Sequence, residues 1–466
     1  MQGGDLKRMD LTLREIADVI QCETFGELPS ENLAGVSTDS RHLQPGELFV
    51  ALRGEYFDGH EFIQAAQNSG AIAAMVDSTY VKQQENLSKE PLIVVEDTLR
   101  AYQDTARYYR QKCTPIVVAI TGSAGKTTCK EFIHAVLSEK FSVHKNTKSF
   151  NNHVGVPATL LALEPEHEIL VAELGTSNFG EISHLSSLVE PDICVLLNIG
   201  YAHLEFLKSP DGVAKAKMEI FEHAAEKNIS LYNADDDVLR RQSFPSTHVL
   251  TFGIMKPADV TAADLSCDKD ACYRFSVQDN FFQLAIPGRH NVYNALAAIA
   301  TGLYFDIPVD MIQSAIERVT FVEHRMNVMH QNNIVILDDV YNANPGSCAA
   351  ALQTLADIQP GEGGRRIAVL GDMLELGEYA TKEHERLAMV ARENDIDALF
   401  LFGDFSKLTA QKAAQMNFSF AKHFKSKQSL LAELKEFISD SDALLIKGSR
   451  SMHMEEIVDS LTGEQV

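Results

Sequence analysis

The sequence predicts an α/β protein of three domains, in which helices cover mainly parallel sheets. One observation is length, because 466 residues exceed what a single hydrophobic core ordinarily organises. Another is the alternation of short apolar runs with stretches of helical periodicity, which is typical of parallel sheets covered by helices. The alternation falls into three successive units, and we expect domain limits of 1–113, 114–320 and 321–466.

The composition argues against several classes of protein. Hydrophobic residues make up 45% of the chain and charged residues 23%, as in globular proteins. The net charge of −24, without a dense basic run, disfavours binding to nucleic acid or to an anionic membrane. The N-terminus has no apolar signal region and no run approaches the ~18 apolar residues of a membrane span, so we expect a cytoplasmic protein. Seven scattered cysteines without C-x-x-C spacing argue against a zinc site or a disulfide framework.

The first unit predicts a small α/β domain. Its apolar positions indicate helices at 11–20, 59–69 and 98–112 and strands at 46–54, 72–76 and 91–95. Two polar stretches, 37–41 and 58–60, interrupt this pattern. The first of them contains hydroxyl side chains, among them Ser40, together with an acid and Arg41. Such a group of side chains suits hydrogen bonding to a nucleobase or a diphosphate. A capped turn is the alternative that these residues leave open.

The second unit opens on PIVVAITGSAGKTTCK, residues 115–130, which reads as a buried strand, a phosphate loop and a helix. Gly122 and Gly125 would let backbone N–H groups approach phosphate oxygens, assisted by the positive end of the helix. Lys126 would neutralise the β- and γ-phosphates, and the Thr127 hydroxyl would bind Mg²⁺. The pattern is shorter than G-x-x-x-x-G-K-[ST], and a turn with an incidental lysine is the alternative.

Two later strands of this unit end near residues that could bind a metal. EILVAEL (168–174) and DICVLLNIG (192–200) predict buried parallel strands, and ligands bind beyond the carboxyl ends of such strands. Glu173 would be costly to bury without a partner, which favours a metal. His203 is a second candidate ligand, and a structural histidine is the alternative. A hairpin around Asp279 and a helix from about 288 to 305 follow.

The third unit again alternates strands with helices, as in a doubly wound domain. Strands are expected at 334–339, 366–370, 398–402 and 443–447, with helices from about 347 and at 383–393. No G-x-G-x-x-G follows its first strand, which disfavours a dinucleotide cofactor. Polar residues gather after the strands, in Asp338 to Pro345, Gly371-Asp372 and Lys447 to Arg450.

Taken in order, these motifs resemble the Mur ligase family, the ATP-dependent amide-bond ligases of peptidoglycan precursor synthesis. The resemblance covers nearly the whole chain. It rests on residues 39–41, 121–128, 198–204, 216–219, 290–295 and 323–325, with details at 339–345, 369–377 and 447–450.

The resemblance implies a uridine-nucleotide domain, a central ATPase domain and a C-terminal Rossmann-like domain that closes over ATP. It implies three small-molecule substrates, ATP, a UDP-N-acetylmuramoyl tripeptide and D-alanyl-D-alanine, and an acyl-phosphate intermediate, in a cytoplasmic, monomeric enzyme. The catalytic residues would be Lys126, Lys217 and His203, and Thr127, Glu173, His203 and Lys217 would serve two Mg²⁺ ions. The nucleotide would contact Gly122, Ser123, Ala124, Gly125, Lys126, Thr127, Thr128, Asn294, Arg325 and Asp339. The other substrates would contact Ser40, Arg41, Asn151, Asn152, Tyr341, Asn342, Asn344, Lys447 and Arg450.

Lys217 has two interpretations. From the pattern AKAKMEI alone it is an exposed lysine on an amphipathic helix. The resemblance implies instead that it is carbamylated, so that the new carboxylate joins the second Mg²⁺ site.

Three stretches depart from the family's usual residues: Ser149-Phe150, Thr176 to Asn178 and Phe206-Leu207. They affect the expected muramoyl-peptide contacts more than the ATP site. They also motivate a competing hypothesis, a non-catalytic protein that responds to nucleotide.

Two related enzymes share part of the pattern. One is the sister ligase that adds diaminopimelate or lysine, whose usual Asp-Asn-Pro-Arg stretch does not occur in this sequence. Another is folylpolyglutamate synthetase, which shares the phosphate loop and the carbamylated lysine. It has no separate uridine domain, whereas 113 residues precede the phosphate-loop strand in this chain.

Overall fold

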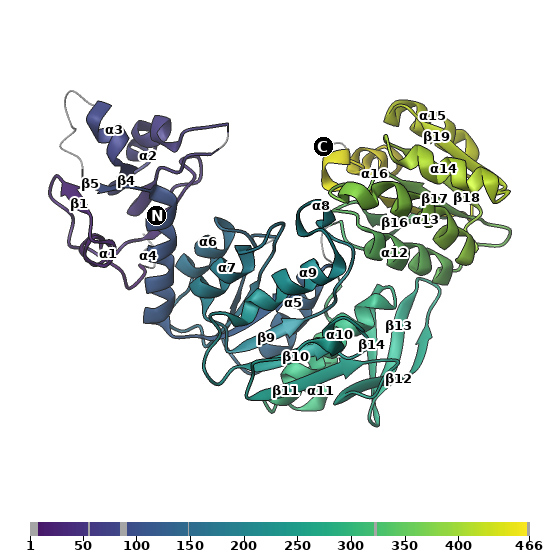
Figure 1. Ribbon diagram of the computed structural model, residues 1–466, viewed down its shortest axis with the longest axis horizontal. Helices are drawn as coiled ribbons and strands as arrows, with labels where there is room; N and C mark the ends of the chain where they lie inside the picture. The colour runs from purple at the N-terminus through teal and green to yellow at the C-terminus, as the bar shows by residue number, and fades with distance from the viewer. Residues whose placement is uncertain (1–7, 55, 84–90, 148, 321–323, 464–466) are drawn as a thin grey trace, which may run out of the picture.

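The computed structural model describes residues 8–54, 56–83, 91–147, 149–320 and 324–463, which form three sheets in chain order (Figure 1). The central sheet lies between the other two in space as well as in sequence (Figure 1). Among the described helices, none combines the length and the apolar character needed to cross a bilayer.

The first sheet has five strands in the order β1-β5-β4-β3-β2, and only the β1–β5 pair is antiparallel. Its elements are α1 (Leu13–Ile20), β1 (Glu23–Phe25), β2 (Gly35–Ser37), β3 (Glu47–Val50), η1 (Gly59–Phe62), α2 (Ile63–Asn68), β4 (Ala73–Asp77), α3 (Ser78–Gln83), β5 (Leu92–Val95) and α4 (Thr98–Cys113). Helix α1 begins two residues later than predicted. Thr12 and Glu15 form a capping box there, each side chain accepting a hydrogen bond from the other's backbone N–H.

The central sheet has nine strands in the order β14-β13-β12-β11-β10-β9-β6-β8-β7. The pairs from β12 to β7 are parallel, and the hairpin at the other edge is antiparallel. Its strands are β6 (Ile116–Thr121), β7 (Val143–Lys145), β8 (Ile169–Glu173), β9 (Ile193–Leu196), β10 (Ile229–Asn233), β11 (His248–Gly253), β12 (Val260–Cys267), β13 (Cys272–Val277) and β14 (Asn280–Pro287). Its helices are α5 (Lys126–Leu137), α6 (Gly155–Leu161), α7 (Glu181–Val189), α8 (Leu204–Leu207), α9 (Pro210–Met218), η2 (Glu219–Phe221), η3 (Leu239–Arg241), α10 (His290–Tyr304) and α11 (Val309–Glu317).

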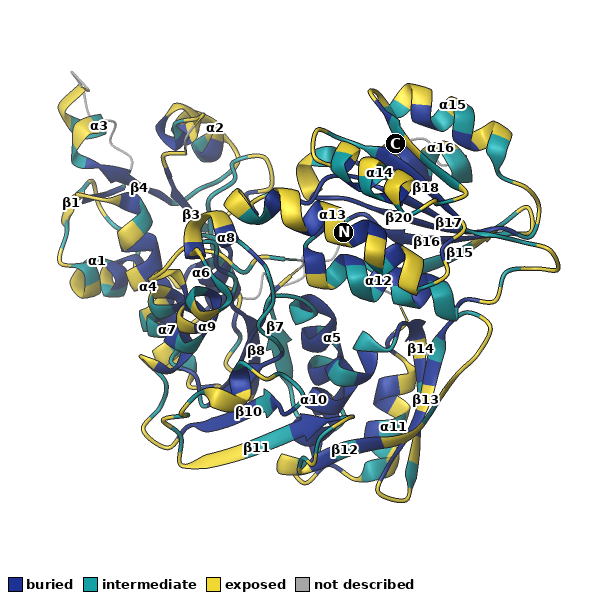
Figure 2. Ribbon diagram, turned by 45° about the vertical axis from the view of Figure 1, so that its right-hand side comes forward, coloured by how far each residue is buried: buried dark blue, intermediate teal, exposed yellow. Residues whose placement is uncertain are grey.

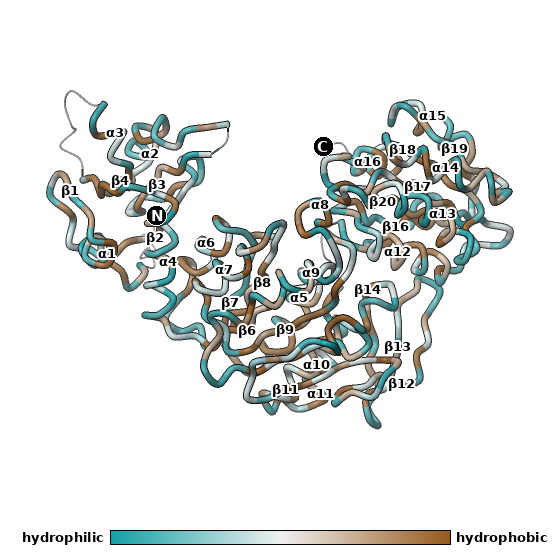
Figure 3. The backbone as a smooth tube through the Cα atoms, in the orientation of Figure 1, coloured by the Kyte–Doolittle hydropathy of each residue, from teal (hydrophilic) through white to brown (hydrophobic). Residues whose placement is uncertain are grey.

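Helices cover both faces of the central sheet. Buried residues of α5, α10 and α11 form one core with one face, and those of α4, α6 and α7 form a second core with the other face. The second core also includes buried residues of β3, β4 and β5, so α4 joins the first sheet to the central one. Figure 2 shows the strands of the central sheet largely buried, and Figure 3 shows apolar residues running along them.

The third sheet has six strands in the order β15-β16-β20-β17-β18-β19, and only the β15–β16 pair is antiparallel. Its strands are β15 (Asn327–Gln331), β16 (Ile334–Asp339), β17 (Arg366–Leu370), β18 (Ala398–Phe402), β19 (Phe420–Phe424) and β20 (Ala443–Lys447). Its helices are α12 (Pro345–Asp357), η4 (Gly377–Tyr379), α13 (Ala380–Glu393), α14 (Ser406–Gln415), α15 (Lys427–Phe437), η5 (Arg450–Met452) and α16 (Glu455–Thr462). The predicted fold class therefore holds for all three units.

The sequence patterns did not reveal every strand. β2 and β7 are three residues long and half-buried throughout, and β11 is exposed at its start. Such strands show neither a continuous apolar run nor a strict alternation, which are the two patterns by which a strand is predicted. The strands that carry the site, β6, β8, β9 and β16, were all predicted.

Candidate active site

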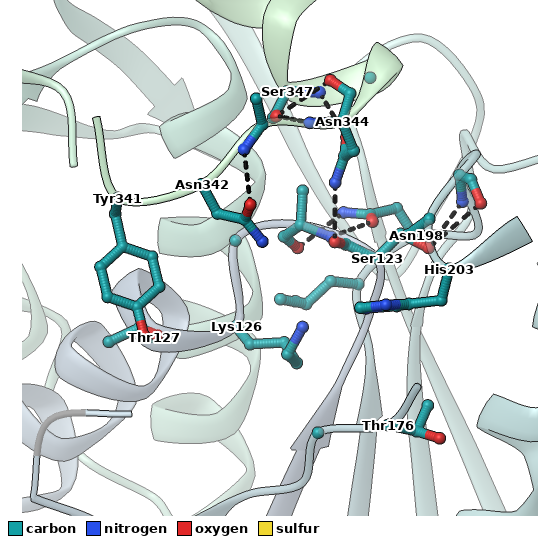
Figure 4. Close-up of a pocket in the computed structure, with 18 of the residues that line it drawn as sticks. Ser123, Lys126, Thr127, Thr176, Asn198, His203, Tyr341, Asn342, Asn344 and Ser347 are labelled. Carbon is teal, nitrogen blue, oxygen red and sulfur yellow. Dashed lines mark hydrogen bonds between the residues drawn. The ribbon is translucent and has the colours of Figure 1, made fainter. Parts of the chain in front are cut away.

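A cavity of about 1580 Å³ lies between the central and the third sheet. Most of the predicted site residues line it, although they come from segments as far apart as residues 123 and 450: Ser123, Ala124, Gly125, Lys126, Thr127, Thr128, Asn151, Asn152, Glu173, His203, Asn294, Arg325, Asp339, Tyr341, Asn342, Asn344, Lys447 and Arg450. Figure 4 shows some of them converging from both sheets.

The phosphate loop connects β6 to α5. Gly125 has a φ of +83° and caps the helix. A Cβ atom on it would lie 2.6 Å from Asn294 Oδ1, so the position requires glycine for both reasons. Lys126 Nζ donates a hydrogen bond to Gly122 O at 2.8 Å. Burial lowers the pKa of Lys126.

Asn198 holds the loop in shape from the end of β9. Its Oδ1 accepts from Ala124 N at 2.9 Å, its backbone O accepts from Ser123 N at 3.1 Å, and its Nδ2 donates to Ala124 O at 3.1 Å (Figure 4). The backbone N–H groups of Ser123 and Ala124 therefore already have partners. An α-helix leaves the N–H groups of its first turn unpaired, so those at Lys126 to Thr128 are the better phosphate donors.

Glu173, at the end of β8, is 1% exposed and is held by neutral groups. Thr127 Oγ1 donates to its Oε2 at 2.9 Å, and Asn151 Nδ2 donates to its Oε1 at 2.7 Å. The backbone N–H of Glu173 donates to Asn146 Oδ1 at 2.6 Å. A buried carboxylate favours nearby positive charge, and the charges of Lys126 and Lys130 also act on this one.

The donor chemistry at this point fits Mg²⁺. Mg²⁺ prefers oxygen ligands and usually takes one or two carboxylates together with substrate phosphates. Glu173 and Thr127 offer such oxygens beside the phosphate loop. Within the described residues, no group of three or more histidine, cysteine, aspartate or glutamate side chains is placed to hold a metal.

Lys217 is buried, which corrects the interpretation of an exposed lysine on an amphipathic helix. Its side chain is on α9 and the residue is 2% exposed. Burial lowers its pKa well below the usual value, and the nearby charge of Lys126 adds to this effect. The periodicity was misleading because α9 is covered on more than one side. Lys217 does not line the cavity itself.

The third unit contributes a buried ion pair and two stacked side chains. Lys447 forms an ion pair with Asp339 and donates to Asn342 O at 2.8 Å. Burial raises the pKa of Asp339 although Lys447 opposes that shift. The Arg325 guanidinium lies 3.8 Å from the centre of the Tyr341 ring. Asn344 Nδ2 donates to Ser123 O at 3.3 Å, so the third unit contacts the phosphate loop directly (Figure 4).

The predicted uridine site lies away from this cavity. Ser40 and Arg41 are in the first unit and do not line the cavity. The Arg41 side chain pairs with Asp39, and this contact holds the pKa of Asp39 well below its usual range. The turn also has a hydrogen bond between Ser37 and Asp39, as in the capped-turn alternative. Glu323, one of the residues behind the resemblance, lies outside the described residues.

Family models match three segments of the chain. The Mur ligase family catalytic domain matches residues 32–110, the Mur ligase middle domain residues 120–302, and the Mur ligase glutamate ligase domain residues 324–450. The chain belongs to the Mur ligase family. The predicted family is thereby confirmed.

Individual relatives agree with that assignment. This Mur ligase is 38% identical to the UDP-N-acetylmuramoyl-tripeptide–D-alanyl-D-alanine ligase of Bacillus subtilis (strain 168), over 97% of this chain and 98% of the relative. It is similar to the crystal structure of MurF from Acinetobacter baumannii, with a TM-score of 0.88, 30% identity, and coverage of 99% and 100% of the two chains. It is also similar to the MurF ligase of Thermotoga maritima in complex with ADP, with a TM-score of 0.79, 28% identity and coverage of 92% and 97%.

Two of the three departures from the family's usual residues, at Phe150 and at Thr176 to Asn178, lie in loops beside the metal-binding candidates, whereas Phe206-Leu207 lies on α8. Phe150 O accepts from Asn146 Nδ2 at 2.7 Å, which ties that loop to the end of β8. Thr176 Oγ1 donates to Asn178 O at 2.6 Å. Both loops of this Mur ligase therefore have ordered internal hydrogen bonds.

Sequence reasoning missed several residues that shape this site. Asn146 and Gly175 hold the loop of Asn151, and Glu375 contacts His203. Asn146 and Gly175 carry no sequence signal of their own, because their partners are distant in the chain. Glu375 belongs to the stretch 369–377 that supported the resemblance, but no role could be derived for it.

Proposed function

We propose that this Mur ligase joins D-alanyl-D-alanine to a UDP-N-acetylmuramoyl tripeptide at the expense of ATP, in peptidoglycan precursor synthesis. Its relatives bear the name of that activity over nearly their full length. The observation that carries the proposal is the shared cavity: the phosphate loop, Glu173, and the Asp339 and Lys447 pair of the third unit line one space.

The reaction proceeds in two steps. A carboxylate oxygen of the tripeptide attacks the γ-phosphorus of ATP, and the bond from that phosphorus to the β,γ-bridging oxygen breaks. ADP departs, and the tripeptide is left as an acyl phosphate. The amine of D-alanyl-D-alanine then attacks the acyl carbon, loses a proton and displaces phosphate. Lys126 and the N–H groups at the start of α5 stabilise the charge on the phosphoryl oxygens. Asn294, beside Gly125, contacts adenine, and Arg325 and Asp339 hold ribose and phosphates.

Thr127, Glu173, His203 and Lys217 would hold two Mg²⁺ ions. When bound, they neutralise charge on the phosphates. Lys217 takes part as a carbamate, in which its neutral amine adds to CO₂ and releases a proton. Support comes from its burial, which favours the neutral amine that this addition requires.

The three sheets suggest the division of labour, with domain limits of 1–113, 114–320 and 321–466. The first domain holds the uridine nucleotide through Ser40 and Arg41, and Asn151, Asn152, Tyr341, Asn342, Asn344, Lys447 and Arg450 contact the two substrates to be joined. One chain supplies every one of these groups, and we expect the enzyme to act as a monomer. It works in the cytoplasm, where ATP is supplied, and its acidity disfavours nucleic acid as a partner.

Phosphate release by the purified protein with ATP and Mg²⁺ tests the proposal. Release that requires both the UDP-N-acetylmuramoyl tripeptide and D-alanyl-D-alanine supports it. Release with diaminopimelate or lysine and the UDP-muramoyl dipeptide would identify the sister activity, and release with a folate and glutamate would identify a folylpolyglutamate synthetase. No release under any pairing would indicate a nucleotide-binding protein instead.

A further inference from the structure

The segment that carries His203 and Lys217 leaves the central sheet and packs against the third unit. Helix α8 lies beside the third unit in Figure 1, and α9 follows it in the chain. Leu204, Leu207, Val213 and Ala216 form a separate buried cluster, against which Tyr379 of η4 packs. The placement of His203, at the cap of α8, therefore depends on contacts with another domain.

Several contacts hold α8 and the residues just before it against the third unit. The Glu375 carboxylate lies 2.6 Å from His203 Nδ1, and the backbone O of Glu375 accepts from Glu205 N at 3.0 Å. A Cβ atom on Gly377 would lie 3.0 Å from Glu205 Cα, which shows how closely the two segments approach. The rings of Tyr201 and Tyr379 pack edge to face, with their centres 6.0 Å apart.

The contact between His203 and Glu375 has a chemical consequence. A carboxylate beside Nδ1 favours the tautomer that carries its proton there, which leaves the lone pair on Nε2. His203 itself has a φ of +53°, in the left-handed region, at the cap of α8. Its ring lines the cavity with Glu173 and Lys126.

We propose that Glu375 is a positioning residue of the reaction, which aims His203 Nε2 at the magnesium site and does so only while the third unit is docked on α8. This inference rests on the metal-binding role proposed for His203. Docking of the third unit then completes the metal site, because the backbone O and the side-chain carboxylate of Glu375 both hold the turn that carries His203. It completes the nucleotide site as well, through the residues of the third unit that line the cavity.

The contact is suited to positioning more than to stability. The side chains of His203 and Glu375 are 25% and 49% exposed, and ion pairs at such exposure contribute little to folding. Removing the carboxylate should therefore change the metal site without unfolding the chain. The matched control is Glu378, an exposed glutamate three residues further on whose side chain makes no hydrogen bond or ion pair within the described part of the chain.

The test measures binding of Mn²⁺ by electron paramagnetic resonance, with full-length protein and the nonhydrolysable analogue AMP-PNP. We expect Glu375→Ala to weaken Mn²⁺ binding by about 10-fold or more, with an unchanged thermal midpoint and unchanged binding of the analogue without metal. Glu375→Gln should retain more affinity, because its amide oxygen still accepts from Nδ1–H. Glu378→Ala should match the wild type.

A double-mutant cycle locates the effect. His203→Ala should weaken Mn²⁺ binding, and adding Glu375→Ala to it should cost little more, because both changes remove the same interaction. Additive losses, or wild-type Mn²⁺ affinity in Glu375→Ala or in His203→Ala, would overturn the inference. Absence of ligase activity in a wild type that shows these Mn²⁺ effects would overturn the proposed function and leave the positioning role intact.

Discussion

Lys217 is a buried amine next to a cavity that is proposed to bind triphosphate and two cations. An ammonium there would repel metal ions, and burial lowers its pKa. The same burial makes the uncharged amine available for carbamylation, so one physical cause accounts for both the low pKa and the proposed modification.

We expect Lys217→Ala to lower the ligase rate by roughly 100-fold, because a group that stabilises the transferred phosphoryl is lost. Added acetate or another short carboxylate should restore part of the rate by occupying the vacated space. Steady-state phosphate release measures both effects. Lys215→Ala, on the same helix but exposed, should behave as the wild type. Full activity in Lys217→Ala would show that carbamylation is not required.

His134, on α5, makes the folded state sensitive to acid. Burial and the nearby charge of Lys145 lower its pKa to about 4, whereas the pKa of a histidine in an unfolded chain is about 6.5. The unfolded state therefore binds more protons between these values, and the contribution to stability is complete above pH ~6.5 and declines as the pH falls towards ~4.

Thermal midpoints measured between about pH 5 and 7 test this effect. They should decrease with falling pH in the wild type and decrease less steeply in His134→Gln. The exposed His223 provides the control, since His223→Gln should keep the wild-type slope. Equal slopes in all three proteins would contradict the assignment to His134.

Among the secondary-structure elements, the end of β8 and the loop residues Asn146 and Asn151 form one assembly. Lys130, which is fully buried, donates to Asn146 O at 2.8 Å, and Gly175 N donates to Asn151 O at 2.9 Å. Asn146 in turn binds the backbone of Glu173. A strand end and a loop that are separated in sequence thus hold the proposed metal ligand between them.

Gly175→Ala should disturb this assembly without unfolding it. The new Cβ atom would lie 2.8 Å from Asn151 Cγ and Oδ1, so the Asn151 side chain must leave Glu173. A misplacement of about 1 Å at a catalytic site costs about 100-fold in rate. The circular dichroism spectrum should remain unchanged while the rate of phosphate release falls. Adding Asn151→Gly to Gly175→Ala should restore any lost thermal stability, because it removes the side chain that the new Cβ atom meets. An unaffected rate in Gly175→Ala would show that the contact is dispensable.

Across the molecule as a whole, the turn between β12 and β13 joins the central sheet to the third unit. Ala271 is fully buried within the core of the third unit, and Gln359 N donates to Lys269 O at 2.9 Å. Tyr273 Oη donates to Asp357 Oδ2 at 2.8 Å, at the end of α12. This turn is therefore a contact region between the third and the central unit, in addition to α8 and the phosphate loop.

Tyr273→Phe should weaken this joint by about 1 kcal/mol, because Asp357 loses its hydrogen bond. That corresponds to a midpoint lower by about 2–4 °C in a domain of this size. Differential scanning calorimetry measures the change, and Tyr304→Phe, at an exposed tyrosine, should leave the midpoint unchanged. A midpoint equal to that of the wild type would show that the turn does not couple the two units.

The local elements and the chemistry of the phosphate loop follow from the order of the amino acids alone. A buried β-branched strand, small residues and a lysine before a helix have few structural solutions, so Gly125, Lys126 and Thr127 could be assigned before any fold was known. The apolar runs of β8 and β16 placed Glu173 and Asp339 at strand ends for the same reason. The limits of the three domains remain a prediction.

Which distant residues meet is determined by tertiary packing and could not be predicted. The burial of Lys217, the loop held by Asn146 and Gly175, and the contact of Glu375 with His203 depend on how separate helices and sheets pack. Periodicity describes one face of one element, whereas burial and pairing at these residues are set by neighbours that are distant in the chain.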